Sequence, residues 1–279
     1  ACYEGGGHFR HLKELYRADE LTNAINRIIE DMNHEFVVDV VTRAFTSHDY
    51  ALTARNLRRS SDPRRRSDAL DFMDREAITA RLMQLLDIRK SDDLTVDVSE
   101  AVVREIREYL EALDLIGAYE IMTATGGAPQ KRVVFTQPGM RFCQAQALVH
   151  VLTKDEYFSQ LGQFEADAIV KALLDEVRGR MLEDIVLFET ISVLSKGKSA
   201  FKLQFDAGEF DMVVYDHDRG TCRVYEVKHT AERFSGQARH LLDRERCAQC
   251  ERRFGPIEER VVIYRGPSGP DENGVQYKN

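Results

Sequence analysis

The sequence has no uninterrupted apolar run that approaches the roughly 18 residues of a membrane-spanning helix. Its first residues, ACYEGGGHFRHLKELY, also lack the apolar core of a secretory signal peptide. Without such a run, we expect no membrane-spanning helix and no membrane partner. Together the two absences predict a cytoplasmic protein.

Cysteine is scarce: the five cysteines form an odd, scattered set, which argues against a disulfide framework. Cys247 and Cys250 are spaced as half of a zinc site, and His240 lies on the same expected helix. A second CxxC or HxxxH pair is missing, whereas a structural zinc ion takes about four ligands. The spacing is typical of helical cysteines that face a core, and zinc remains the open alternative.

An excess of positive charge is also missing, because the formal net charge is −8. Contact with DNA or RNA would therefore need a local basic patch. The segment RNLRRSSDPRRRSD offers one, with six arginines around a proline. We interpret it as an exposed linker, with phosphate contact as the alternative. The arginines are Arg55, Arg58, Arg59, Arg64, Arg65 and Arg66.

What is present fits a globular chain of two or three domains, since 279 residues with 43% hydrophobic content can bury more than one core. Residues 1–60 have helical periodicity. Residues 61–153 run helix, helix, β-hairpin, helix, which is the order of a winged helix. Residues 154–279 run α, three β-strands, α, β, which predicts an α/β domain. The expected fold class is α+β multidomain.

The second helix of the expected winged helix, residues 99–115, starts at Ser99 or Asp97 as N-cap. It carries five acids against Arg104 and Arg107. This balance repels phosphates, so we interpret the winged helix as an architectural or protein-contacting module that does not read DNA.

A phosphate-binding loop is absent as well. Gly197, Lys198 and Ser199 resemble its end, but Ser192 stands where its first glycine belongs. The segment also runs from helix to strand, the reverse of that loop. We therefore expect no ATP site within this chain.

Charged residues interrupt two expected strands, GEFDMVVYD and VYEVKHT. Strand side chains alternate between faces, so Glu226 and Lys228 share a face. Glu209 and Asp211 share a face of the preceding strand, with Phe210 and Met212 on the other. If the strands pair around the turn at 217–220, Asp211 comes near Glu226. The plain alternative is a surface hairpin with an exposed ion pair.

Two carboxylates on adjacent strands form a hard-oxygen site for Mg²⁺ or Mn²⁺, and the Val227 carbonyl can add a ligand. Lys228 would orient a water molecule, and the helical Glu183 would extend the acidic cluster. This set suits phosphodiester hydrolysis. Crowding of Asp211 and Glu226 further predicts that Glu226→Gln is neutral or stabilising without metal.

The ordered set of Glu183, Asp211 and Glu226-x-Lys228 resembles the PD-(D/E)xK nucleases, with their restriction-endonuclease-like fold. The segments GRMLEDIVLFETI, GEFDMVVYD, VYEVKHT and VVIYRG resemble the nuclease-like domain at the C-terminus of archaeal-type AAA+ ATPases. EGGGHFRHLKELY resembles the entry to the lid helices of that family, and KRVVFTQPGMR the turn after its wing. The turn has Gln137 where the family tends to have an acid.

The resemblance implies a helical lid-like segment (1–60), a winged helix (61–153) and a nuclease-like domain (154–279). It implies catalytic roles for Glu183, Asp211, Glu226 and Lys228, with Asp211, Glu226 and Val227 at the metal. Three functions stay open: a Mg²⁺-dependent nuclease acting on DNA or RNA, a non-catalytic binding module, and a purely structural region that assembles ATPase subunits. ATP hydrolysis would belong to an upstream ATPase domain of the same protein, whose subunits can assemble as a homo-oligomer.

Overall fold

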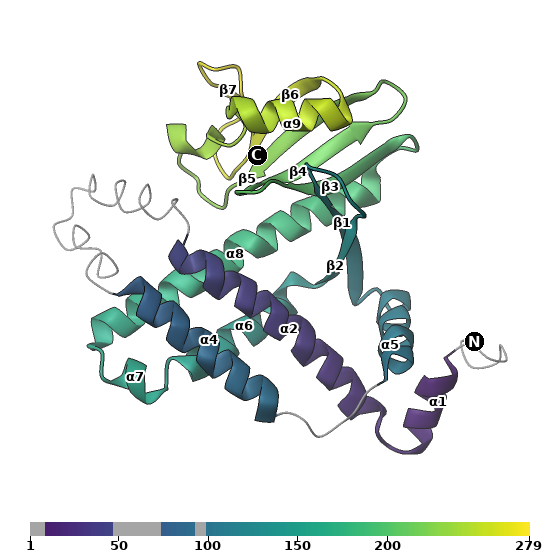
Figure 1. Cartoon of the computed structure of the whole chain (residues 1–279), viewed down its shortest axis with the longest axis vertical. Coiled ribbons are helices and arrows are strands. Elements are labelled where there is room, and N and C mark those ends of the chain that lie inside the picture. The colour runs from purple at the N-terminus through teal and green to yellow at the C-terminus, as the bar shows by residue number, and fades with distance from the viewer. Residues whose placement is uncertain (1–8, 47–73, 93–98) are drawn as a thin grey trace. The chain divides into compact units, whose positions relative to one another are not determined.

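The computed structural model describes residues 9–46, 74–92 and 99–279 and shows an α+β protein with one mixed sheet (Figure 1). The chain divides into two compact units. The helical unit comprises the described residues within 1–116 and 137–177. The sheet unit comprises residues 117–136 and 178–279.

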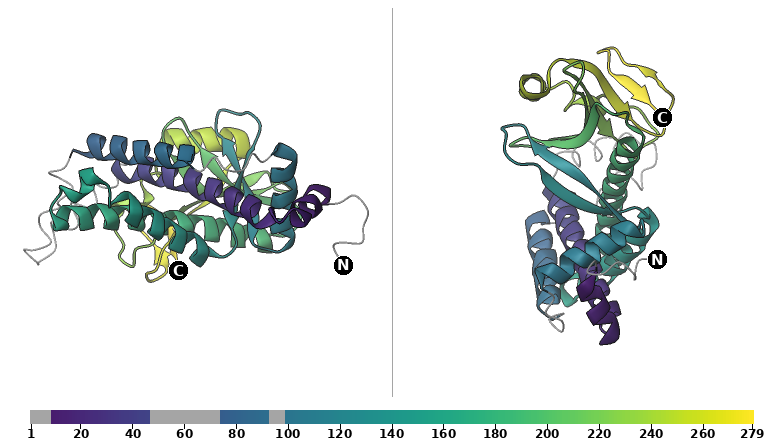
Figure 2. Two further views of the ribbon diagram at one scale, coloured as in Figure 1. Left: turned by 90° about the horizontal axis from the view of Figure 1, so that it is seen from below. Right: turned by 90° about the vertical axis from the view of Figure 1, so that its right-hand side faces the viewer.

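The helical unit is built from amphipathic helices. In α4, Ile78, Leu82 and Leu86 recur every four residues and are buried, so one face of this helix lies in the core. Helices α2 and α4 lie side by side, as Figures 1 and 2 show. Helix α8 (Gln163–Val193) begins in this unit and ends in the other. The remaining helices are α1 (Arg10–Arg17), α2 (Leu21–Thr46), α4 (Arg75–Asp92), α5 (Glu100–Ala112), α6 (Pro138–Leu152) and α7 (Glu156–Ser159).

Helix α5 begins at the expected N-cap, because the Ser99 hydroxyl accepts a hydrogen bond from the Val102 N–H at 3.5 Å. One of its acids, Glu105, stabilises the start of α1. Its carboxylate accepts hydrogen bonds from the backbone N–H groups of His11 and Leu12 at 2.7 and 3.1 Å. Part of the acidic character of α5 therefore holds two helices together.

The sheet unit contains eight strands in the order β2-β1-β3-β4-β5-β6-β8-β7. The antiparallel strands β3, β4 and β5 follow α8 directly. A short 3₁₀ helix, η3 (Ser235–Ala238), and α9 (Arg244–Phe254) connect β5 to the parallel strand β6. The α-βββ-α-β order expected for the C-terminal part is thus confirmed. The strands are β1 (Ile116–Thr123), β2 (Gln130–Phe135), β3 (Lys198–Gln204), β4 (Glu209–Asp216), β5 (Thr221–Val227), β6 (Ile257–Ile263), β7 (Gly269–Pro270) and β8 (Gln276–Lys278).

The hairpin of β1 and β2, expected as the wing of a winged helix, belongs to this sheet. Strand β1 runs parallel to β3, with Ile121 opposite Lys202 and Thr123 opposite Gln204. These backbone pairings place residues 117–136 in the sheet unit, although helices α4, α5 and α6 flank the hairpin in the expected order. The chain therefore divides differently from the ranges 61–153 and 154–279.

Helices cover both faces of the central strands (Figure 2). On one face, Phe254 and Cys250 of α9 pack with Phe201 of β3. On the other, Leu187 of α8 packs with Met212 of β4. The central strands are consequently buried on both sides, which explains their nearly continuous apolar runs.

Strand β4 contains a β-bulge opposite Lys202. Phe201 pairs with Val213, yet Leu203 pairs with Phe210, so β4 carries one extra residue between these points. The bulge sends Phe210 to the α9 side and Met212 to the α8 side. The expectation that Phe210 and Met212 share a face was wrong, because strict alternation fails at a bulge.

Candidate functional site

Strands β4 and β5 bring two of the predicted carboxylates together. Met212 pairs with Tyr225, and Asp211 and Glu226 are the next residues along the two strands beyond this pair. The Val227 N–H donates a hydrogen bond to Asp211 Oδ2 at 2.8 Å. The side chains of both acids are buried. The Asp211 carboxylate is thus fixed by the backbone of the neighbouring strand, and a ligand role for the Val227 carbonyl stays a prediction.

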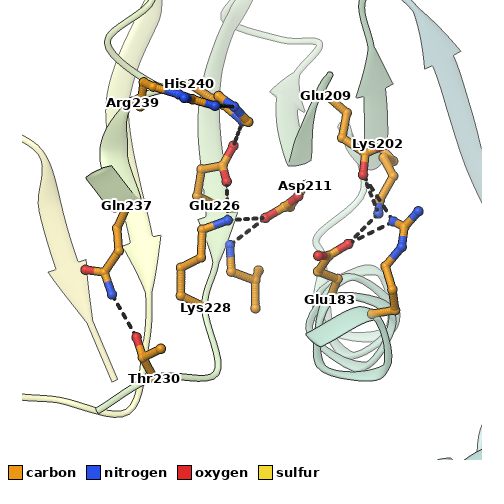
Figure 3. Close-up of polar contacts among 12 residues, drawn as sticks. Glu183, Lys202, Glu209, Asp211, Glu226, Lys228, Thr230, Gln237, Arg239 and His240 are labelled. Carbon is orange, nitrogen blue, oxygen red and sulfur yellow. Dashed lines mark hydrogen bonds and ion pairs between the residues drawn. The ribbon is translucent and has the colours of Figure 1, made fainter. Parts of the chain in front are cut away.

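Lys228 links the two acids. Its Nζ lies 2.7 Å from Glu226 Oε2 and 3.8 Å from Asp211 Oδ2, as Figure 3 shows. The Lys228 side chain is 25% exposed, whereas that of Glu226 is 2% exposed. The exposed-pair alternative therefore does not describe this site: only the lysine reaches solvent.

The opposite oxygen of Glu226 contacts a residue that the sequence did not connect with it. Nδ1 of His240 lies 3.3 Å from Glu226 Oε1, a polar contact without the alignment of a hydrogen bond. His240 follows η3, whereas the sequence suggested only a zinc site with Cys247 for it. Nothing in its spacing from Glu226 predicts the contact, since a loop connects them.

The surroundings stabilise the charged forms of Asp211 and Glu226 unequally. Burial raises the pKa of the Asp211 carboxyl well above its ordinary value, and Glu183 and Glu226 raise it further against Lys228. Burial acts on Glu226 in the same direction, but Lys228 and His240 outweigh it and lower its pKa. Asp211 therefore carries the electrostatic strain, and Glu226 is the stabilised carboxylate.

Glu183 lies in a second group of charges, on the α8 side of the sheet. Its Oε2 accepts hydrogen bonds from Lys202 Nζ at 2.8 Å and from Arg180 Nη1 at 3.1 Å. The same two cations contact Glu209 Oε1 at 3.3 and 3.1 Å. Burial favours the neutral form of Glu183, but Lys202 and Arg180 lower its pKa to about 2.

Sequence reasoning missed Lys202, Arg180 and Glu209 as members of the site. Lys202 lies in the apolar run AFKLQF. A lysine is almost never fully buried unless it is paired, so its place in this run was a signal that it has a buried acidic partner. Arg180 lies three residues before Glu183, a spacing that places both on one helix face. Glu209 was placed on the face of Asp211 but given no role.

A metal ion could be held by acids from both groups. Single oxygens of Glu183, Glu209 and Asp211 lie within 4.8 Å of one another. Carboxylate oxygens suit Mg²⁺ and Mn²⁺. The residues present therefore fit a divalent cation, although two of these acids are already paired with Lys202 and Arg180.

The other candidate residues lie elsewhere. Cys247 and Cys250 are buried in the α9-side core, and Cys250 Sγ lies 3.8 Å from Cys222 Sγ. Among the described residues, the group able to hold a metal contains no cysteine. The predicted phosphate contacts fall outside the described residues: Arg55, Arg58, Arg59, Arg64, Arg65 and Arg66.

Comparisons with protein-family models, with curated proteins and with solved structures found no match to this chain. The described helices include none with the length and apolarity to cross a membrane.

Proposed function

We propose that the sheet unit hydrolyses phosphodiester bonds in DNA or RNA with the help of Mg²⁺ or Mn²⁺. The observation that supports this most directly is the position of Lys228 Nζ, 2.7 Å from Glu226 and 3.8 Å from Asp211 at the paired ends of β4 and β5. Two carboxylates can hold the metal ion that such hydrolysis uses, and the adjacent lysine supplies a positive charge where negative charge develops.

Each residue has a chemical role in this proposal. Asp211 and Glu226 would hold the ion, and the Val227 N–H keeps the Asp211 carboxylate in place. A bound Mg²⁺ or Mn²⁺ would lower the pKa of a water molecule and balance charge on the phosphate. The Lys228 ammonium would orient the attacking water or donate to a phosphate oxygen, where negative charge develops.

The alternative is a non-catalytic binding module, and one observation favours it. Both oxygens of Glu226 already contact groups of the chain itself, Lys228 at 2.7 Å and His240 at 3.3 Å. Metal binding would have to replace at least one of these contacts. In this alternative the charges only stabilise a platform for nucleic acid or a partner protein.

Cleavage assays separate the two functions. The purified chain is incubated with single-stranded DNA, duplex DNA and RNA in Mg²⁺, Mn²⁺ or EDTA. We expect metal-dependent cleavage that Lys228→Ala and Glu226→Gln each reduce about 100-fold or more. Lys198→Ala is the matched control, because Lys198 pairs with Asp216 at the far end of β4. If the wild type cuts none of these substrates, the nuclease proposal is wrong and the non-catalytic binding module is the function that stands.

The surrounding protein is part of the same proposal. We infer an upstream ATPase domain, and further copies of the chain as assembly partners, from the resemblance to archaeal-type AAA+ ATPases.

Nucleic-acid contact is assigned to residues 55–66. Replacing Arg58, Arg59, Arg64, Arg65 and Arg66 by alanine should weaken DNA binding and flatten its salt dependence. Replacing Arg104 and Arg107 is the control, and a larger effect there would make α5 the reader. Light scattering tests assembly, and a strict monomer would count against it.

A further inference from the structure

Lys202 is a fully buried cation in the middle of the sheet. Its side chain is 1% exposed, and its neighbours Phe201 and Leu203 lie in the α9-side core. Because neighbouring side chains alternate, Lys202 points to the α8 side, where Glu183 and Glu209 lie. A buried ammonium is costly unless its partners compensate, so these contacts decide whether the strand can fold.

Lys202 and Arg180 together occupy the space between two carboxylates. Lys202 Nζ lies 2.8 Å from Glu183 Oε2 and 3.3 Å from Glu209 Oε1. Arg180 Nη1 lies 3.1 Å from each of the same two oxygens. Figure 3 shows Lys202 between these acids. Two positive groups thus face two negative ones, and the group is neutral without any added ion.

We propose that Lys202, supported by Arg180, is a built-in cation that takes the place of a divalent metal between Glu183 and Glu209. Metal is thereby confined to the side of Asp211 and Glu226. The metal site at Asp211 and Glu226 rests on the proposed function. The position of Lys202 between Glu183 and Glu209 does not.

The charges around the bulge explain this division. Asp211 has one oxygen close to those of Glu183 and Glu209, so the three acids could in principle share an ion. A metal between Glu183 and Glu209 would meet the ammonium of Lys202 and the guanidinium of Arg180 at close range, which repels it. The Asp211 carboxylate is instead held toward Val227, and its cation Lys228 lies 3.8 Å away and is part exposed. An ion can enter there with less displacement of charge.

Two consequences follow for the residues involved. Lys202 is a positioning residue, because it acts on the two acids and not on a substrate. Glu209 is not a metal ligand in the wild type, although its distance from Asp211 suggests one. Glu183 can reach an ion only through its second oxygen, since its Oε2 is bound to Lys202 and Arg180.

Counting bound Mn²⁺ by calorimetry and by spin resonance tests the inference on the whole chain. We expect Glu209→Gln to keep the wild-type number of ions and a dissociation constant within about threefold. Loss of a ligand carboxylate in Asp211→Asn should weaken binding about tenfold or more, since even outer-shell changes cost about 10–100-fold. Lys202→Ala should bind one ion more than the wild type, and Lys202→Arg should not.

Each result decides one way. Loss of an ion in Glu209→Gln, or a dissociation constant raised more than about threefold, overturns the built-in cation, because loss of even a supporting group costs about 10–100-fold in metal affinity. So does a folded Lys202→Ala with no added ion. Lys202→Gln repeats the count with less loss of volume, and refolding of either variant by Mn²⁺ alone supports the inference. A wild type that binds no Mn²⁺ refutes the metal site of the proposed function, and a gain of one ion in Lys202→Ala would still support the built-in cation.

Discussion

Asp211 is the residue at which burial and charge are least compatible. Its carboxylate is buried beside Glu183 and Glu226, which raises its pKa, while Lys228 and His240 contact Glu226 and lower the pKa of that carboxyl. The sequence predicted mutual repulsion between Asp211 and Glu226, which Glu226→Gln was expected to relieve. Contacts to Lys228 and His240, which come from a neighbouring position and from a loop, move that strain to Asp211.

Neutralising the two acids should therefore have opposite effects on stability in EDTA at neutral pH. Asp211→Asn keeps an acceptor for the Val227 N–H and removes the strained charge. It should raise Tm by about 2–4 °C, the shift of roughly 1 kcal/mol. Glu226→Gln leaves Lys228 without its closest carboxylate and should cost about 1–3 kcal/mol. Thermal melts of both variants measure the difference, and stabilisation by Glu226→Gln would restore the crowding hypothesis.

Acid stability reports on Glu183. Its pKa in the folded protein is about 2, below its ordinary value of 4.5, so the folded state favours the carboxylate. This contribution is complete above the unfolded pKa and is lost as pH falls from there toward 2. Glu183→Gln should flatten the acid limb by up to about 1.4 kcal/mol per pH unit. Urea unfolding between neutral pH and the acid range checks this, with Glu258→Gln as an exposed-acid control.

Among the elements, the order along the chain from α8 to β6 and the meeting of Asp211, Glu226 and Lys228 could be predicted, because period-two patterns and a short turn fix a hairpin locally. The bulge in β4 could not, since the strand residues EFDMVVYD contain no glycine or proline that marks it. Pairing of β1 with β3 also lay beyond sequence reasoning. Residues 116–135 form the same hairpin whether it stands alone or extends a sheet.

The junction between α9 and β6 depends on a glycine. Gly255 has φ 75° and ψ −175°, and a Cβ there would collide with the backbone carbonyl of Gly220. Gly255→Ala should cost about 3 kcal/mol or more, adding overpacking to backbone strain. Gly274→Ala is the matched control, because φ is 79° but no atom lies within 4 Å of its Cβ. Similar melting points for the two variants would contradict a role for the close approach.

For the whole molecule, a bound ion should stabilise the sheet unit by mass action. At ten times the dissociation constant, Mg²⁺ or Mn²⁺ should add about 1.4 kcal/mol, or a few degrees of Tm. Asp211→Asn should respond much less. Calorimetry of both proteins in EDTA and in metal provides the measurement, and an equal response in the two would place the ion away from Asp211.

The division into units was the least predictable feature at this scale. Composition changes along 154–279 suggested a boundary in sequence, but the units are not continuous segments. Residues 117–136 join the sheet because β1 finds hydrogen-bonding partners in β3, and such distant pairing leaves no local pattern.

The parallel pairing of β1 with β3 also has a consequence for folding during synthesis. Ile121 must find Lys202, a separation of 202 − 121 = 81 residues, so the hairpin leaves the ribosome long before its partner strand exists. During that interval the backbone edge of β1 and the apolar side chains of Tyr119 and Ile121, buried in the finished protein, have no sheet to join. A nascent chain that contains β1 but not yet β3 can therefore pair prematurely with other strands. A fragment starting at residue 154 would have the reverse problem, because the edge of β3 would lack its partner β1.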